Sequence, residues 1–186
     1  MRLQLLELLA NISDRLERFV LTVGRLSGWV VFLLIGVTIF DVITRRFLVL
    51  GSTKLQELEW HFHVILFMCC LGSAFLQDSH VRIEIFRTRL SPRTQHWIEF
   101  LGSVLLLLPF CALLIYFGTI FAVNSFIDGE SSASATGLGY LWLIKLFLPA
   151  GFILLALSAI TVALRNALRL FRPTGAVEAF DSGDKS

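Results

Sequence analysis

The chain has 186 residues, of which 56% are hydrophobic and only 16% are charged, and its mean hydropathy is +0.78. Soluble domains carry about 25% charged residues, so this composition excludes a water-soluble single domain, and its high hydrophobicity excludes a disordered chain. The formal net charge of +2 is too small to indicate a nucleic-acid partner, which leaves a small integral membrane protein.

Residues 1–21 form an amphipathic segment at the start of the chain. Its apolar residues recur at helical spacing and its charged residues occupy much of the opposite face; the apolar set includes Leu5, Leu8, Leu9, Ile12, Leu16 and Phe19. This pattern is typical of a helix that lies in the membrane interface with its apolar face toward lipid.

Four later segments are long and apolar enough to cross a membrane, which takes about 20 residues. They cover about residues 22–44, 60–77, 100–127 and 138–164. Pro109 and Pro149 are expected to kink the third and fourth spans. Ser91 and Pro92 form a helix start signal, so the third helix should begin ahead of its apolar part.

The predicted fold is an all-α membrane protein with four transmembrane helices and an N-terminal amphipathic interfacial helix. Residues 22–172 form the four-helix membrane domain, and residues 173–186, which are small and polar, form a disordered cytoplasmic tail. Cys69, Cys70 and Cys111 lie inside apolar runs, where we expect them to pack as small hydrophobic side chains.

The distribution of basic residues predicts the orientation. Twelve of the 16 Lys and Arg residues lie in the N-terminal part of the chain up to Arg25, in the loop after the second span, and in the C-terminal part from Arg165 onward, against three in the two opposite loops. Because basic residues accumulate on the cytoplasmic side, both chain ends should be cytoplasmic. This places the protein in a membrane as a multi-pass protein with an even number of spans.

Ionisable residues inside a membrane are candidates for function, and here they are few. Asp41 lies near the outer end of the first span, with Arg45 one helical turn later, a spacing that allows an ion pair. Lys145 lies about two turns inside the fourth span and can extend outward. Two interpretations remain open for these residues: interfacial charge, local or bridging to a partner subunit, or an ion or proton relay.

Residues at the outer ends of the spans are candidates for contact with partners or for membrane anchoring. Glu57 and Glu59 precede Trp60 at the start of the second span, and Trp142 begins the fourth. The acids suit the first turn of a helix, and they also suit contact with an extracytoplasmic partner. The tryptophans are typical of the membrane interface.

Glycines at four-residue spacing predict close helix packing in the first span. Gly24 and Gly28 form a G-x-x-x-G motif, and Gly36 lies further along the same face. The four histidines do not support a haem, because three of the four spans contain none, and no catalytic, cofactor-binding or metal site is predicted.

Three stretches resemble the small membrane subunit (DctQ type) of tripartite ATP-independent periplasmic (TRAP) transporters. They are Leu55–His61, which reads L-Q-E-L-E-W-H; His80–Phe86 with its continuation through Leu90–Thr94; and Leu141–Lys145 followed by Leu148–Phe152. The similarity covers roughly residues 20–172 and includes four spans.

This resemblance implies a scaffold subunit in the bacterial inner membrane, without a cofactor of its own. Its partners would be membrane lipids, a large membrane subunit that carries the substrate and sodium sites, and a periplasmic substrate-binding protein. The substrate would be an organic acid or a related small anion. Asp41, Arg45, Glu57, Glu59, Trp60, Trp142 and Lys145 would then be interface or anchoring residues.

Two alternatives have other requirements. A stand-alone small transporter would work as an oligomer without a large subunit. A four-helix membrane redox subunit would need ligands that the spans do not offer.

Overall fold

The computed structural model describes residues 2–47, 52–77 and 91–171, and within them every regular element is a helix. Four helical segments are long and apolar enough to span a membrane: Leu6–Phe47, Thr53–Leu76, Arg93–Ile127 and Leu141–Leu170. The predicted all-α fold with four spans is therefore confirmed. The predicted tail at 173–186 and the motif at His80–Phe86 lie outside the described residues.

The first span is one long helical path made of α1 (Arg2–Gly28) and α2 (Val30–Phe47). The two helices meet at Trp29, where the backbone forms i→i+3 hydrogen bonds from Trp29 N to Leu26 O and from Phe32 N to Trp29 O, both 3.1 Å. At 1.5 Å per residue, the 42 residues from Leu6 reach about 63 Å, about twice the thickness of a hydrocarbon core. The helix formed by α1 and α2 is therefore longer than one membrane crossing requires.

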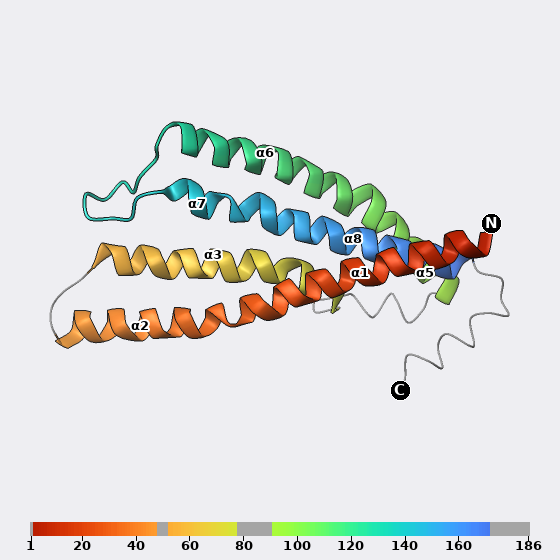
Figure 1. The fold of residues 1–186 in the computed structure, drawn as a ribbon, viewed down its shortest axis with the longest axis horizontal. Coiled ribbons are helices and arrows are strands. Elements are labelled where there is room, and N and C mark those ends of the chain that lie inside the picture. Colours follow the sequence, from red (N-terminus) through yellow and green to blue (C-terminus); the bar gives the residue numbers. More distant parts are fainter. Residues whose placement is uncertain (1, 48–51, 78–90, 172–186) are drawn as a thin grey trace.

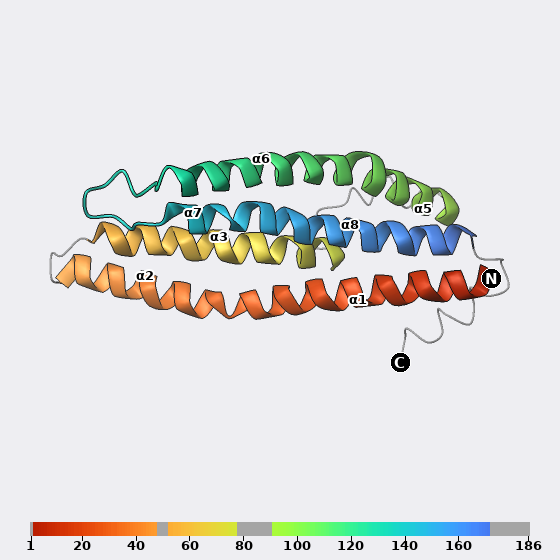
Figure 2. The ribbon, with the colours of Figure 1, turned by 45° about the horizontal axis from the view of Figure 1, so that its top comes forward.

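The amphipathic helix α1 continues along the bundle and packs against α3 (Thr53–Leu76) and α8 (Phe147–Phe171). Figures 1 and 2 show the N-terminal part of α1 beside α8 and its later part beside α3. Its residues Ser13 and Val20 are buried against these helices. Part of the apolar face of α1 is thus covered by protein, and a location in the membrane interface stays a prediction.

The third span consists of α5 (Pro92–Leu101), a π-helical segment η1 (Gly102–Leu107) and α6 (Leu108–Ile127). The predicted start signal is confirmed, because Ser91 Oγ accepts a hydrogen bond from Thr94 N at 3.3 Å and Pro92 is the first helical residue. The π segment directly precedes Pro109, and the helix bends there (Figure 2). A proline and a π-bulge are both recognised causes of a bend.

The fourth span is broken near its outer end into α7 (Leu141–Lys145) and α8. Pro149 explains the break, because a proline ring clashes with the carbonyl of the residue four positions earlier, which here is Lys145. The helical path continues on the other side of Leu146, with Ala150 N donating to Leu146 O at 3.2 Å. The expected effect of Pro149 is therefore seen in this helix.

Helix α8 is the centre of the bundle. It packs against α1, α3, α5 and α6, whereas α2 packs mainly against α3. The buried hydrophobic side chains are mainly small or short; they are Val20, Cys111, Ala122, Leu154, Leu155, Ala159 and Ala163. Small residues let membrane helices approach closely, so α8 holds the other spans together.

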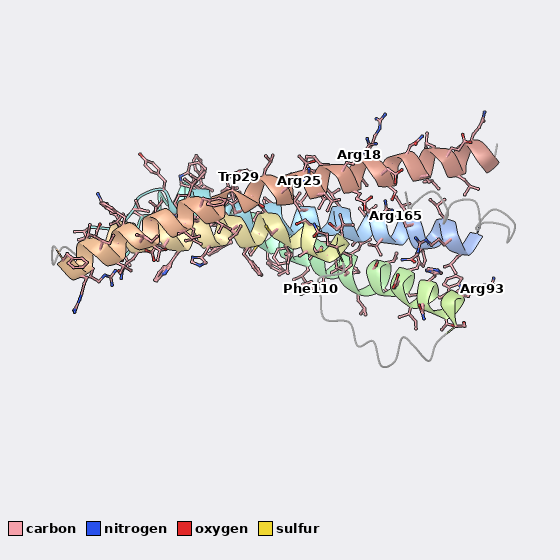
Figure 3. All side chains as sticks on the ribbon, turned by 90° about the horizontal axis from the view of Figure 1, so that it is seen from below. Arg18, Arg25, Trp29, Arg93, Phe110 and Arg165 are labelled. Atoms are coloured by element: carbon pink, nitrogen blue, oxygen red, sulfur yellow. The ribbon has the colours of Figure 1, made fainter. Side chains whose placement is uncertain are left out.

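The two ends of the molecule differ. Figure 1 places the end of α2, the start of α3 and the α6–α7 loop at one end, which we call the loop end. The N-terminus, the start of α5 and the end of α8 lie at the opposite end, and Arg18, Arg93 and Arg165 lie in that half (Figure 3). This arrangement agrees with four antiparallel crossings that bring the start of α1 and the end of α8 to the same end of the bundle.

Candidate functional site

The described part of the chain offers no group of three or more His, Cys, Asp or Glu side chains that could hold a metal ion. Its polar contacts gather instead at the loop end, in the seam between α2 and α3, and between α1 and the last turns of α8. We describe these three places in turn, because they contain nearly all of the candidate residues.

Lys145 at the loop end is paired within the chain. Its side chain is only 15% exposed, its ammonium forms an ion pair with Glu130, and its Nζ lies 4.0 Å from the centre of the Phe121 ring. Lys145 is the last residue of α7, and Glu130 lies in the α6–α7 loop. The hydrogen bond from Lys145 holds the pKa of Glu130 below its ordinary value of 4.5, so the Glu130 carboxylate is charged at neutral pH.

Glu57 ties the α6–α7 loop to α3. Its carboxylate accepts one hydrogen bond from Ser132 Oγ and another from Leu138 N at 2.6 Å. Thr136 Oγ1 donates to Thr53 Oγ1 at 3.2 Å in the same contact. Both oxygens of Glu57 are therefore engaged inside the chain, where they hold the loop over the start of α3.

The tryptophans at the loop end differ in their surroundings. Trp142 on α7 is half-buried and meets Phe126 of α6 edge to face, with ring centres 5.1 Å apart. Trp60 on α3 is largely exposed. Trp142 thus helps to join the third and fourth spans, whereas Trp60 presents its indole outward.

The seam between α2 and α3 contains a pocket of about 570 Å³, which we call the α2–α3 pocket. It is lined chiefly by Asp41, Arg45, Arg46, Gln56, Glu59 and Trp60. The ion pair that the spacing of Asp41 and Arg45 allowed is formed, through Asp41 Oδ2. The structure thus brings four of the predicted candidates, Asp41, Arg45, Glu59 and Trp60, into one place.

The predicted packing glycines lie in different settings. Gly24 of α1 faces Ser73 of α3 so closely that a Cβ would collide with that side chain, whereas a Cβ at Gly28 or Gly36 would meet no described residue within 4 Å. The glycines at the closest contacts with α8 lie elsewhere. A Cβ added at Gly72 of α3 would lie 2.7 Å from Leu154 O of α8. A Cβ added at Gly151 of α8 would lie 2.8 Å from Met68 Cβ of α3.

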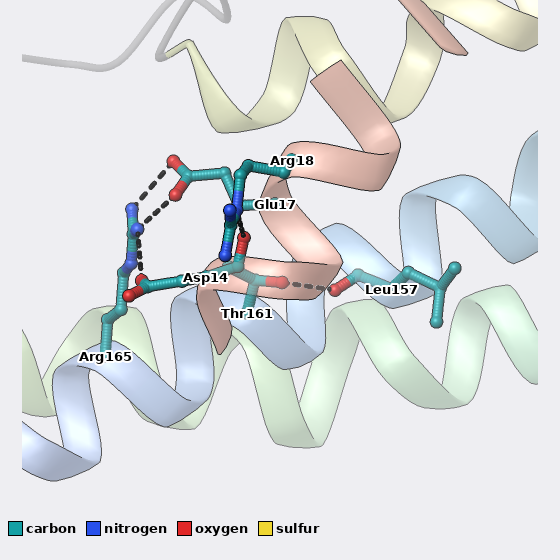
Figure 4. Close-up of polar contacts among 6 residues, drawn as sticks. All are labelled: Asp14, Glu17, Arg18, Leu157, Thr161 and Arg165. Atoms are coloured by element: carbon teal, nitrogen blue, oxygen red, sulfur yellow. Dashed lines mark hydrogen bonds and ion pairs between the residues drawn. The ribbon is translucent and has the colours of Figure 1, made fainter. Parts of the chain in front are cut away.

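Sequence reasoning did not identify the cluster between α1 and α8. Figure 4 shows Arg165 of α8 facing Glu17 and Asp14 of α1, with Arg165 Nη1 donating to Glu17 Oε1 at 2.8 Å. A second nitrogen pairs with Asp14 Oδ1 at 3.3 Å. Beside it, Thr161 is fully buried and donates to Leu157 O at 2.9 Å.

A neighbouring contact joins α8 to α5. Asn166 Oδ1 lies 2.8 Å from His96 Nδ1, and Asn166 Nδ2 donates to Glu99 Oε2 at 3.2 Å and to Val162 O at 3.0 Å. Because the amide oxygen is an acceptor, His96 carries its hydrogen on Nδ1 in this arrangement. The sequence does show acidic residues in α1 and polar residues near the end of the fourth span. It does not show that they pair, because pairing depends on which helices are neighbours.

Large apolar side chains cover the surface between the polar ends. On α2 they are Phe32, Leu33, Ile35, Ile39, Phe40, Val42, Ile43 and Phe47, and α6 has a comparable set. Exposed surface of this kind suits contact with lipid or with helices of another subunit. The arrangement as a whole can support packing and anchoring, and the described residues show no constellation for catalysis.

The family model "Tripartite ATP-independent periplasmic transporters, DctQ component" matches residues 34–170, which is more than half of the chain. The match begins within α2 and includes all of α3, α5, α6, α7 and nearly all of α8. No curated protein and no solved structure matches the chain.

Proposed function

The chain belongs to the DctQ family of small subunits of TRAP transporters, and from this membership we propose that it is the scaffold subunit of a sodium-coupled transporter. A large membrane subunit would carry the substrate and sodium sites, and a periplasmic binding protein would deliver an organic acid or a related small anion. The observation that carries the proposal is the family match over residues 34–170.

The structure supports a scaffold role in two ways. The side chains of Asp41 and Lys145 are only 5% and 15% exposed, and each forms an ion pair within the chain. The apolar surfaces of α2 and α6 are open to other helices. A chain that pairs these two charges internally and leaves apolar faces open is suited to support a partner that does the translocation.

We place the protein in the bacterial inner membrane with the loop end toward the periplasm. The basic residues favour this orientation, because Arg15, Arg18 and Arg25 of α1 lie on the helix that begins at the opposite end. Reporter fusions after residue 186 and within the α6–α7 loop test it. A periplasmic signal from the C-terminal fusion would contradict the proposed topology.

The decisive experiment is purification of the tagged chain from its native membrane in mild detergent. We expect a large multi-span subunit to accompany it, and we expect uptake in reconstituted vesicles to require this subunit, the binding protein and a sodium gradient. Uptake by the small chain alone would instead support a stand-alone transporter. An absorption band characteristic of haem in the purified chain would support a redox subunit.

A matched pair of lysine variants tests the role of the loop end. Lys145→Ala removes the partner of Glu130 and should lower the yield of the complex severalfold, because the α6–α7 loop loses an attachment. Lys54→Ala removes an exposed lysine at the start of α3 and should leave the yield unchanged. Equal yields from both variants would contradict a role for Lys145 in assembly.

A further inference from the structure

The α2–α3 pocket contains two acidic oxygens without hydrogen-bond partners. Oδ1 of Asp41 and Oε1 of Glu59 are both buried and unpaired among the described residues. The Asp41 side chain is only 5% exposed. A buried acceptor without a donor is costly, and more so when it is charged, so the pocket lacks hydrogen-bond donors that an occupant would supply.

The neighbouring arginine Arg45 does not supply them. It pairs with the other oxygen of Asp41, and it also donates to the amide oxygen of Gln56 at 3.0 and 2.8 Å when that amide faces it. Its hydrogen-bonding capacity is thus directed to Asp41 Oδ2 and Gln56. The occupant must therefore bring its own N–H or O–H groups to Asp41 Oδ1 and Glu59 Oε1.

The same pocket presents an unpaired charge of the opposite sign. Arg46 is exposed and forms no ion pair or hydrogen bond with a described residue. A guanidinium binds phosphate well, through two parallel hydrogen bonds. The pocket therefore offers two carboxylate acceptors for a cationic group and, beside them, a guanidinium donor for an anionic group. A molecule that carries both charges, a zwitterion, matches this arrangement.

The location of the pocket favours a lipid. It lies toward the loop end of α2 and α3, beside the exposed indole of Trp60, and such aromatic residues mark the level of membrane headgroups. The exposed side chains of Ile39, Phe40 and Ile43 continue from it along α2. An acyl chain bound along this face would leave its headgroup at the pocket.

We propose that the α2–α3 pocket binds the headgroup of a phospholipid with a primary ammonium, such as phosphatidylethanolamine. The ammonium donates to Asp41 Oδ1 and Glu59 Oε1, and the phosphate binds Arg46. A lysine or arginine from a partner protein would satisfy the two acids but would leave Arg46 unpaired. The lipid is thus the occupant that accounts for the free groups of both signs.

The test compares lipids that differ only in their N–H donors. The full chain, with the subunits that accompany it, is placed in lipid nanodiscs that contain equal amounts of phosphatidylethanolamine and phosphatidylcholine with identical acyl chains. Lipid retained after purification is then measured by native mass spectrometry. We expect roughly tenfold preference for phosphatidylethanolamine, because the trimethylammonium of phosphatidylcholine has no N–H group. Equal retention of the two lipids would overturn the proposal.

Variants connect the preference to the pocket. Glu59→Gln leaves the Asp41–Arg45 pair intact and should remove most of the preference, and Asp41→Asn should do the same. Arg46→Gln should lower retention of both lipids. Asp128→Asn, which changes an exposed acid in the α6–α7 loop, serves as the control.

Unchanged lipid preference in Glu59→Gln, with loss of a co-purifying protein, would overturn the proposal in favour of a basic side chain from a partner. The lipid measurement does not depend on transport, so its failure is distinguishable from failure of the proposed transporter function.

Discussion

The fourth span and the first differ in how much of their apolar surface the chain itself covers. In the most apolar stretch of each, 44% of the residues of the fourth span are buried inside the protein, against 11% in the first. Both are apolar enough to cross a membrane, so hydrophobicity alone does not distinguish them. The difference indicates that α8 holds the subunit together, whereas α2 keeps its surface for lipid or for another subunit.

Two leucines of the same size give the strongest test of this difference. Leu155 on α8 is 6% exposed, and Leu33 on α2 is 57% exposed. Leu155→Ala should lower the free energy of unfolding by about 2–5 kcal/mol, because it leaves a cavity in packed surroundings. Leu33→Ala should change it little. The measurement is thermal unfolding of the purified chain in detergent, and equal losses would show that α8 has no special role.

Two glycines test the same contrast through overpacking. A Cβ at Gly72 would approach the α8 backbone at Leu154 O to 2.7 Å, so Gly72→Ala should destabilise the chain by about 1–3 kcal/mol. Gly36→Ala on α2 adds its methyl group to open space and should be neutral or slightly stabilising, since alanine favours helix. The unfolding temperatures of the two variants should move in different directions. A stable Gly72→Ala protein would mean that α3 and α8 can separate easily.

The attachment of α1 to α8 is expected to contribute less. Arg165 joins Glu17 and Asp14, but its side chain is 40% exposed, and solvent-exposed ion pairs contribute about 0–1 kcal/mol. Arg165→Gln should therefore lower stability by up to about 1 kcal/mol, and added salt should reduce the difference from the parent protein. Arg169→Gln, an exposed arginine one turn later, is the control. A loss as large as that of Leu155→Ala would place α1 in the core of the fold.

The smallest expected effect concerns the pH dependence of the loop end. The pKa of Glu130 is lowered below 4.5 by its bond with Lys145, so the pair stabilises the loop above that pH and is lost as pH falls through the lowered value. Fluorescence of Trp142, in a background where Trp29, Trp60 and Trp97 are phenylalanine, should change only in that acidic range. Glu130→Gln should give the acidic signal already at neutral pH. A change centred above 4.5 would contradict the sign of this shift.

Much of the fold was predictable because each feature depends on neighbours in sequence. The apolar runs determine the four spans, Ser91 and Pro92 start a helix, and Asp41 and Arg45 are one turn apart. The pairing of Lys145 with Glu130 was not predictable, because it depends on how the α6–α7 loop folds back.

The contacts of α8 show the same limit. Periodicity shows that a helix has a particular face, but it does not show which helix covers that face. For this reason Gly24, Gly28 and Gly36 were expected to act together, although among the described residues only Gly24 of these three closely approaches another helix, and Gly72 and Gly151 were not identified. Arg165 was interpreted as a residue that orients the chain, and its bonds to α1 became visible only when α1 and α8 were placed side by side.

The π-helical segment Gly102–Leu107 has a consequence for insertions and deletions in this span. Its hydrogen bonds span five residues, as in the bond from Leu108 N to Ser103 O, so it accommodates one more residue than an α-helix of the same rise. Deleting a single residue there would remove the π segment and leave α5 and α6 in nearly the same angular phase, because the wider π turn has already absorbed the extra residue. His96 and Glu99 would then still face Asn166. A single-residue deletion within α6 has no such segment to absorb it and would turn α5 by about 100° relative to the part of α6 beyond the deletion, which would separate these side chains from Asn166.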